Sequence, residues 1–147
     1  MATSNSTPPE GGLFHPSDLI SSYSRAQAIA DGVLVDVTET AKEAGFRIPV
    51  ALTRAAWAEC VAWSEADTKR QVPQDEAGRL WDVLWMAHNG IRSLLSKSIV
   101  LNPIKFVLYR VPRGGRATRP QKTLLKAVFG HGDKGEPVLT IMLPEED

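Results

Sequence analysis

The chain contains 147 residues, of which 17 are basic and 17 are acidic, so its formal net charge is zero. This length and a hydrophobic content of 43% are typical of one folded domain with a sizeable core. The single cysteine excludes an internal disulfide framework and a cysteine-rich zinc module. No apolar run approaches the roughly 20 residues of a membrane-spanning helix, and the start lacks a signal-peptide pattern, so we expect a cytoplasmic protein. Neutrality also argues against an acidic surface that mimics nucleic-acid phosphates.

Residues 1–12 are small, polar and rich in proline and glycine, so they have little to bury. We therefore expect a flexible tail at residues 1–12 and a single α+β domain at residues 13–147. No internal repeat divides this domain.

The first elements of the domain are expected to be short. A helix is predicted at residues 24–31, where Ser24 is a good N-cap. Residues 33–37 are rich in β-branched side chains and predict a strand. Thr38 is then expected to cap a second short helix, which Gly45 ends.

The middle of the chain contains the strongest helical signals. Residues 46–52 are expected to be extended, and Thr53 is the best helix start in the sequence. Residues 76–95 carry an apolar stripe at helical spacing, which predicts the longest helix. A second stripe lies beside the first, so we expect this helix to be buried nearly all round. Its members are Trp81, Trp85 and His88.

The last third changes to strand-like patterns. Residues 104–111, 122–129 and 138–143 are runs of β-forming residues, separated by glycine-rich turns. Consecutive strands usually pair, so they predict a three-stranded antiparallel meander. The expected fold is therefore α+β, with the helices packed on a small C-terminal three-stranded antiparallel sheet.

Several long strings of this sequence resemble an uncharacterised bacterial family. They lie at residues 23–38, 45–46, 49–53, 74–86 and 135–144. The resemblance covers nearly all of the chain after residue 20. Members of that family occur on plasmids, integrative elements and other mobile DNA. The resemblance therefore implies an accessory role, such as plasmid maintenance or resistance to host defence, and it transfers no functional residues.

Charge is segregated along the chain, although the total is zero. Residues 1–82 carry a net charge of −5, residues 83–132 carry +9 with no acidic residue, and residues 133–147 carry −4. Segregated charge produces local electric fields, and such fields attract and orient charged partners. The basic middle is where we expect a partner to bind.

The sharpest candidate site is the segment at residues 110–122, RVPRGGRATRPQK, which is expected to form a turn beyond the sheet. Arginine suits bidentate contacts with phosphate or carboxylate groups. The alternatives are a solvated hairpin loop and a partner for the chain's own acidic segments. No aromatic residue alternates with these arginines, so a stacking platform for single strands is not predicted. The expected partner-binding residues are Arg110, Arg113, Arg116, Arg119 and Lys122.

The four tryptophans, Trp57, Trp63, Trp81 and Trp85, are expected to pack in the core. The alternative is that an exposed tryptophan anchors a protein interface, where this residue type is enriched.

Residues with catalytic potential show no catalytic pattern. The acidic stretch at residues 59–76 predicts a solvated surface rather than paired carboxylates. The histidines have no metal-ligand spacing, Cys60 is expected to be buried, and His131 is expected to be exposed. A nucleophilic pair of Cys60 with His88 remains an alternative without a surrounding signature. Residues 23–34 also resemble the early strand and helix of some ADP-ribosyltransferases, but the predicted C-terminal strands lack the glutamate that those folds need.

Together these observations favour a non-enzymatic accessory protein of a mobile element. The expected partner is a host protein or ribonucleoprotein complex, whose binding would inhibit a defence system such as restriction or CRISPR. The first alternative is a nucleic-acid-binding protein that uses the basic loop at residues 110–122. The second is a small enzyme similar to ADP-ribosyltransferases. No metal, cofactor or membrane contact is expected.

Overall fold

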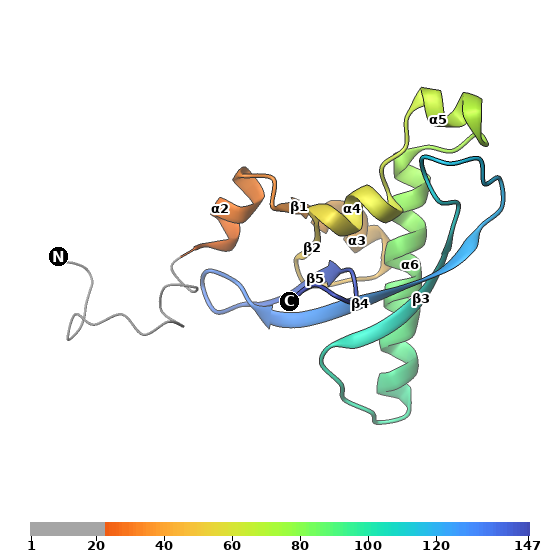
Figure 1. Cartoon of the computed structure of the whole chain (residues 1–147). Helices are drawn as coiled ribbons and strands as arrows, with labels where there is room; N and C mark the ends of the chain where they lie inside the picture. The colour runs from red at the N-terminus through yellow and green to blue at the C-terminus, as the bar shows by residue number, and fades with distance from the viewer. Residues whose placement is uncertain (1–22) are drawn as a thin grey trace.

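The computed structural model describes residues 23–147 (Figure 1). The flexible tail predicted at residues 1–12 and the predicted start of the domain at residue 13 lie outside the described residues. Across residues 23–147, no helix combines the length and apolar character that crossing a membrane requires.

Short helices and strands alternate in the first half of the described chain. They are α2 (Arg25–Ala30), β1 (Leu34–Asp36), α3 (Thr38–Ala44) and β2 (Val50–Thr53). Ser24 caps α2 as predicted, because its side chain accepts a hydrogen bond from the backbone N–H of Gln27. The prediction that Thr38 caps α3 is wrong. Val37 occupies the cap position, and the Thr38 hydroxyl instead accepts from the N–H of Val50 at 3.2 Å and donates to the carboxylate of Asp36 at 2.6 Å.

Three helices follow in the middle of the chain. They are α4 (Arg54–Cys60), α5 (Glu65–Arg70) and α6 (Glu76–Ser96). Thr53 caps α4 as predicted, with its hydroxyl oxygen accepting from the N–H of Ala56. Helix α5 was not among the predicted elements. Its signal is a capping box, in which the side chains of Ser64 and Asp67 each accept a hydrogen bond from the other's backbone N–H.

The expectation that α6 is buried nearly all round is wrong. Val83 and Leu84 of its first stripe are fully buried, but Leu95 at the end of that stripe is 58% exposed, and on the second stripe Trp81 is 37% and Trp85 is 46% exposed. The reason is that the sheet, α3 and α4 contact α6 from the side of its first stripe. The side that carries both tryptophans therefore remains in solvent.

The strands of the last third are paired as the predicted meander. They are β3 (Ile104–Arg110), β4 (Gln121–His131) and β5 (Pro137–Met142), and β4 pairs antiparallel with both neighbours. The prediction that this meander is the whole sheet is wrong. The sheet is five-stranded and mixed, with the order β1-β2-β5-β4-β3. Strand β2 lies parallel to β5 and antiparallel to β1.

The physical reason for the larger sheet lies in β2. Val50, Ala51 and Leu52 form an unbroken apolar run, and all three are fully buried. Such a run is typical of a strand that has neighbours on both sides and is covered on both faces. Its parallel partner places Val50 opposite Leu139, a pairing too distant along the chain for a local pattern to encode.

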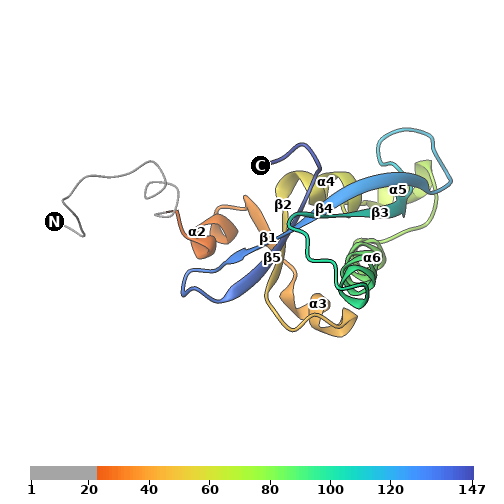
Figure 2. The same cartoon turned by 90° about the horizontal axis from the view of Figure 1, so that it is seen from below.

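The core lies between one face of the sheet and the helices α3, α4 and α6. Leu52, Ile141 and Leu125 point into it from three strands, and Ala41 and Leu84 meet them from α3 and α6. Figure 2 shows α3 and α6 on the same side of the sheet, with the C-terminal segment on the other side. In Figure 1, α6 passes behind β3 and β4, and the front of this hairpin carries no helix.

Candidate functional site

The structure divides the predicted binding residues into two groups. Arg110 and Arg113 are bound to acidic side chains of the same chain. The remaining three are exposed, and their side chains make no hydrogen bond or ion pair with any residue in the range 23–147. These three are Arg116, Arg119 and Lys122.

Arg110 and Arg113 fasten the hairpin to the helices beside it. The Nη2 of Arg110 donates to Oε2 of Glu59 at 3.1 Å, at the end of α4. The Nε of Arg113 donates to Oδ2 of Asp67 at 2.7 Å, in the first turn of α5. The predicted alternative, in which the basic loop binds the chain's own acidic segments, therefore holds for these two residues.

Asp67 is the acidic residue at the centre of this contact between α5 and the loop. It is buried, it accepts hydrogen bonds from the N–H and O–H of Ser64, and it also binds guanidinium nitrogens of Arg70 and Arg113. Burial disfavours the ionised carboxylate, but the hydrogen bonds from Ser64 and Arg113 outweigh it and lower the pKa of Asp67 to about 2. Asp67 is thus a structural anion that joins α5 to the loop.

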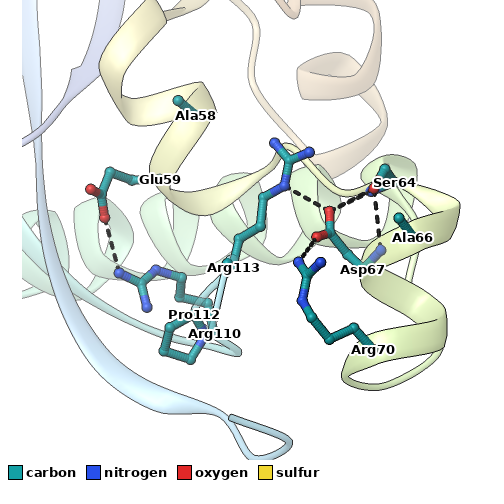
Figure 3. Close-up of a pocket in the computed structure, with 10 residues that line it drawn as sticks. Ala58, Glu59, Ser64, Ala66, Asp67, Arg70, Arg110, Pro112 and Arg113 are labelled. Carbon is teal, nitrogen blue, oxygen red and sulfur yellow. Dashed lines mark hydrogen bonds and ion pairs between the residues drawn. The ribbon is translucent and has the colours of Figure 1, made fainter. Parts of the chain in front are cut away.

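A pocket of about 450 Å³ lies between α4, α5 and the base of the loop (Figure 3). In Figure 3 the two outer nitrogens of Arg113 point away from Asp67, toward the space near Ala58. The small side chains of Ala58 and Ala66 leave this space open. The pocket is therefore rimmed by guanidinium groups, two of which are partly neutralised by Asp67.

The backbone of the loop is also held by Gln71. Its Nε2 donates to the carbonyl oxygens of Pro112 and Ala117, both at 2.7 Å, and its Oε1 accepts from the N–H of Gly114 at 3.2 Å. These three bonds fix the path of the loop, so Arg116 and Arg119 project from an anchored turn.

The side of the β3–β4 hairpin that no helix covers is called the outer face here. Its lysines continue the positive charge of the loop along the sheet. In the register of β3 and β4, Tyr109 lies opposite Lys122 and Lys105 lies opposite Lys126. Directly opposite residues of an antiparallel pair share a face. Tyr109 is 58% exposed. The outer face consists of Lys105, Val107, Tyr109, Lys122, Leu124 and Lys126.

Sequence reasoning missed the outer face, although a signal for it was present. Phe106 and Leu108 alternate with Lys105 and Tyr109 along β3, and this pattern places a lysine and an aromatic residue on the side away from the core. No aromatic residue alternates with the loop arginines themselves, and it is the pairing of β3 with β4 that brings Tyr109 beside Lys122.

Among the acidic C-terminal residues, Glu146 contacts two strands of the sheet. The ammonium group of Lys126 contacts the backbone carbonyl of Glu146, and the side chain of Glu146 accepts from the hydroxyl of Thr53 at 2.7 Å. Asp133 lies at the opposite end, where it accepts from the N–H groups of Arg25 and Ala26. Neither segment contacts the loop arginines.

The tryptophans are divided between the core and the surface. The core role predicted for all four is right for Trp63, which is buried, and Trp57 packs partly buried against the core. It is wrong for Trp81 and Trp85, whose rings stack with their centroids 5.9 Å apart and their planes at 16° on the exposed side of α6.

The structure separates the candidate nucleophile from its candidate base. Cys60 is buried as predicted and lies beside Arg79 and Arg110, and burial raises the pKa of its thiol. His88 lies two and a half turns beyond Arg79 on α6, roughly 13 Å along the helix axis, and packs edge-on to Phe46. No hydrogen bond joins Cys60 and His88 in the described part of the chain.

The other residues that were considered for catalysis have structural roles or lie at the surface. In the acidic stretch, Glu59 and Asp67 form ion pairs, and the Asp75 side chain caps α6. The described strands contain no glutamate. His131 is exposed, as predicted.

Comparison with known proteins gives a family but no named relative. The model of a protein family, described as a family of unknown function (DUF6573), matches residues 11–147. No curated protein and no solved structure matches the chain.

Proposed function

The chain belongs to this family of unknown function, DUF6573, and we propose that it acts by binding a macromolecule through the β3–β4 hairpin. The site consists of the outer face and the loop beyond it. Nucleic acid is the partner whose chemistry fits this surface best.

The observation that carries the proposal is a set of uncompensated cations around one exposed aromatic ring. Lys105, Lys122, Arg116 and Arg119 are exposed and bind no other group within residues 23–147. The basic stretch at residues 83–132 contains no acidic residue, so no carboxylate of the hairpin offsets their charge. Such a surface attracts a polyanion.

Tyr109 favours single-stranded over double-stranded nucleic acid. Its ring lies on the flat outer face, next to Lys122 and beyond the apolar pair of Val107 and Leu124. A base of a single strand can stack on such a ring while its phosphates contact the lysines, and base–aromatic stacking contributes about 1–3 kcal/mol. A base pair within a duplex has no free face to offer.

The test measures binding of a fluorescent single-stranded oligonucleotide at salt concentrations from about 50 to 300 mM. Three to four phosphate contacts predict a slope of log K against log salt of roughly −2 to −3. Replacing Arg116, Arg119 and Lys122 together by alanine is expected to reduce that slope by about 2. Tyr109→Ala is expected to weaken binding at least fivefold without changing the slope, because it removes stacking and no charge.

A matched control replaces Arg47, Arg92 and Lys97 by alanine. This changes the net charge by the same amount at exposed positions away from the hairpin. An equal loss of binding in this control would show that only the overall charge matters. That result, or the absence of binding at the lowest salt concentration, would contradict the proposal.

A protein partner is the second candidate, and the exposed stack of Trp81 and Trp85 favours it. Exposed tryptophans often supply the buried centre of protein interfaces. The test is a tagged pull-down from a nuclease-treated bacterial lysate at moderate salt. A protein that wild type retains and the Trp81→Ala, Trp85→Ala double variant loses would support this function, and equal retention by both would contradict it.

For the wider role we propose a non-enzymatic accessory protein of a bacterial mobile element that blocks a host defence system such as restriction or CRISPR. The sequence resemblance to proteins of mobile DNA supports this role. Expression of the chain is then expected to raise the establishment of an unprotected plasmid in a restricting or CRISPR-immune host. Unchanged establishment in both hosts would contradict it.

A further inference from the structure

Arg79 is a buried cation whose hydrogen-bond partners are all neutral. Its side chain, on the first turn of α6, is only 4% exposed. The Nε donates to the carbonyl of Val61 at 3.0 Å, and Nη1 donates to the carbonyl of Val111 at 3.0 Å and to Oε1 of Gln74 at 2.7 Å. The guanidinium carbon also lies 4.6 Å from the centroid of the Trp63 ring. All of these partners are neutral.

No acidic group in the described chain forms an ion pair with this guanidinium. Burial lowers the pKa of Arg79, and the positive charges of Arg110 and Arg113 lower it further, while Cys60 and Asp67 act in the opposite direction. Asp82 interacts with Arg79 electrostatically but forms no ion pair with it. A buried charge is unfavourable unless an opposite charge compensates it. The environment of Arg79 is therefore one in which an anion would be stabilised.

A cavity of about 60 Å³ adjoins this residue. Its lining includes Arg79, Arg110, Cys60, Asp82, Tyr109 and Pro120. The Nη2 of Arg79 and the Nε of Arg110 are both buried, and neither has a hydrogen-bond partner within residues 23–147, although the Cys60 thiol lies close enough to Arg110 for the guanidinium to oppose the rise in its pKa that burial causes. Since one water needs about 10–15 Å³ on this scale, the cavity has room for about five heavy atoms, the size of a tetrahedral oxoanion.

We infer that this cavity binds one phosphate group, held between Arg79 and Arg110. Guanidinium N–H groups match the spacing of two oxygens of a tetrahedral oxoanion and bind it through charge-assisted hydrogen bonds. The two donors without partners belong to two arginines of the same cavity, on α6 and on β3. The inference does not depend on the proposed function, because neither Arg79 nor Arg110 is among the cations that carry that function, although Tyr109 of the outer face and Pro120 of the loop also line the cavity.

The other polar groups of the cavity set limits on its ligand. Cys60 supplies no negative charge, because burial raises the pKa of its thiol. Asp82 lines the cavity and makes no hydrogen bond there, so its carboxylate opposes an anion. Glu59 is bound to Nη2 of Arg110, which leaves Nε for the ligand.

The size of the cavity also restricts the source of the phosphate. A free phosphate ion fits, and so does a phosphate monoester, such as the 5′ end of an oligonucleotide, whose single ester chain leaves past the exposed Tyr109 and Pro120. A phosphodiester within a strand carries two ester chains and does not fit.

The experiment titrates inorganic phosphate into the ¹⁵N-labelled full chain at constant ionic strength, with chloride as the balancing ion. The arginine Nε–Hε signals report the site directly. We expect the signals of Arg79 and Arg110 to shift saturably, with the signal of Arg54 unchanged. No saturable shift below 20 mM phosphate would overturn the inference, because water would then fill the cavity.

Variants make the assignment specific. Arg110→Met is expected to weaken phosphate binding at least tenfold, whereas Arg116→Met, an equal charge change on the same hairpin, is expected to change it less than twofold. If both variants weaken phosphate binding equally, the inference is overturned. Asp82→Asn is expected to strengthen binding two- to fivefold. If Asp82→Asn instead lowers the stability of the protein and does not strengthen phosphate binding, Asp82 is the counter-ion of Arg79. That result would also overturn the inference.

Two oligonucleotides then identify the source of the phosphate. If a 5′-phosphorylated strand binds more tightly than its 5′-hydroxyl counterpart, and Arg110→Met removes the difference, the ligand is a nucleic-acid end. If the two strands bind equally while inorganic phosphate still binds, the ligand is free phosphate. Binding of the 5′-hydroxyl strand tests the proposed function separately, so the two ideas can fail independently.

Discussion

Asp67 holds α5 and the β3–β4 loop together through a single carboxylate. Its ionised form is stabilised by Ser64 and Arg113, with a pKa of about 2 against an ordinary value of 3.8. A depressed pKa means that ionised Asp67 stabilises the folded state above about pH 4, and that this contribution disappears as the pH falls toward 2.

Asp67→Asn keeps the size of the side chain and removes its charge. We expect the variant to have a lower free energy of unfolding than wild type between pH 5 and 7, and the difference to shrink between pH 4 and pH 2. Urea denaturation at a series of pH values measures this. Glu65→Gln, an exposed change on the same helix, is the control. A difference that stays constant across this range would show that Asp67 acts by packing rather than by charge.

Gly45 illustrates a second constraint at the scale of one residue. It ends α3 with φ of 110°, and a Cβ there would lie 2.8 Å from Nε2 of His88. Gly32 also has positive φ, but a Cβ there meets nothing within 4 Å. Gly32→Ala is therefore expected to lower the free energy of unfolding by about 1–2 kcal/mol, the cost of the left-handed backbone alone.

Gly45→Ala is expected to cost clearly more than Gly32→Ala in the same urea denaturation experiment, because the new methyl group must also displace His88 from its contact with Phe46. Adding His88→Ala should recover the excess. If the two glycine variants have the same free energy of unfolding, the contact with His88 does not contribute to stability.

At the scale of elements, α5 and the loop behave as one unit. Gln71, just after α5, binds the loop backbone at Pro112, Gly114 and Ala117. We expect Gln71→Ala to raise the hydrogen-exchange rate of the Gly114 amide at least tenfold. The core strands should keep their protection, since loss of a local anchor opens only the segment that it holds.

Lys69→Ala serves as the control for that experiment, because Lys69 is an exposed residue of α5 whose side chain makes no hydrogen bond within the described range. Protection of Gly114 that survives Gln71→Ala would mean that Arg113 and Asp67 alone hold the loop. Faster exchange throughout β3 and β4 would mean instead that the loop stabilises the whole hairpin.

The elements themselves were largely predictable from the sequence. Caps such as Ser24 and Thr53, and the glycine that ends α3, are local signals that tertiary contacts did not override. The capping box of α5 was also local but was not recognised, because the helix is short and acidic. The outer face was encoded in the alternation along β3, although only pairing with β4 shows that Tyr109 and Lys122 are neighbours.

At the scale of the whole molecule, local sequence patterns were not sufficient to predict the sheet or the site. The pairing of β2 with β5 joins Val50 and Leu139, which are 89 residues apart, and it converts a predicted three-stranded meander into a five-stranded sheet. The same limit applies to the site. The sequence showed that residues 110–122 are basic, but not that Glu59 and Asp67 neutralise part of that segment or that Arg79 lies buried beside Arg110.

The folded distribution of charge gives a final prediction. The acidic C-terminal segment lies against the sheet at Lys126, on the edge of the outer face. Glu145 and Asp147 are exposed there, and neither contributes a side-chain hydrogen bond within residues 23–147. Because exposed charges interact over about 10 Å at moderate salt, these carboxylates are expected to repel a polyanion that approaches the lysines.

Glu145→Gln combined with Asp147→Asn is therefore expected to tighten binding of a single-stranded oligonucleotide by about two- to fivefold at 50 mM salt and to have no effect at 500 mM. Glu39→Gln with Glu43→Gln changes the net charge equally on α3, across the sheet from the outer face, and is expected to change affinity much less. Fluorescence anisotropy titrations of both double variants measure the difference. Equal effects from both pairs would mean that the oligonucleotide responds to net charge, and the binding surface would then lie elsewhere than on the β3–β4 hairpin.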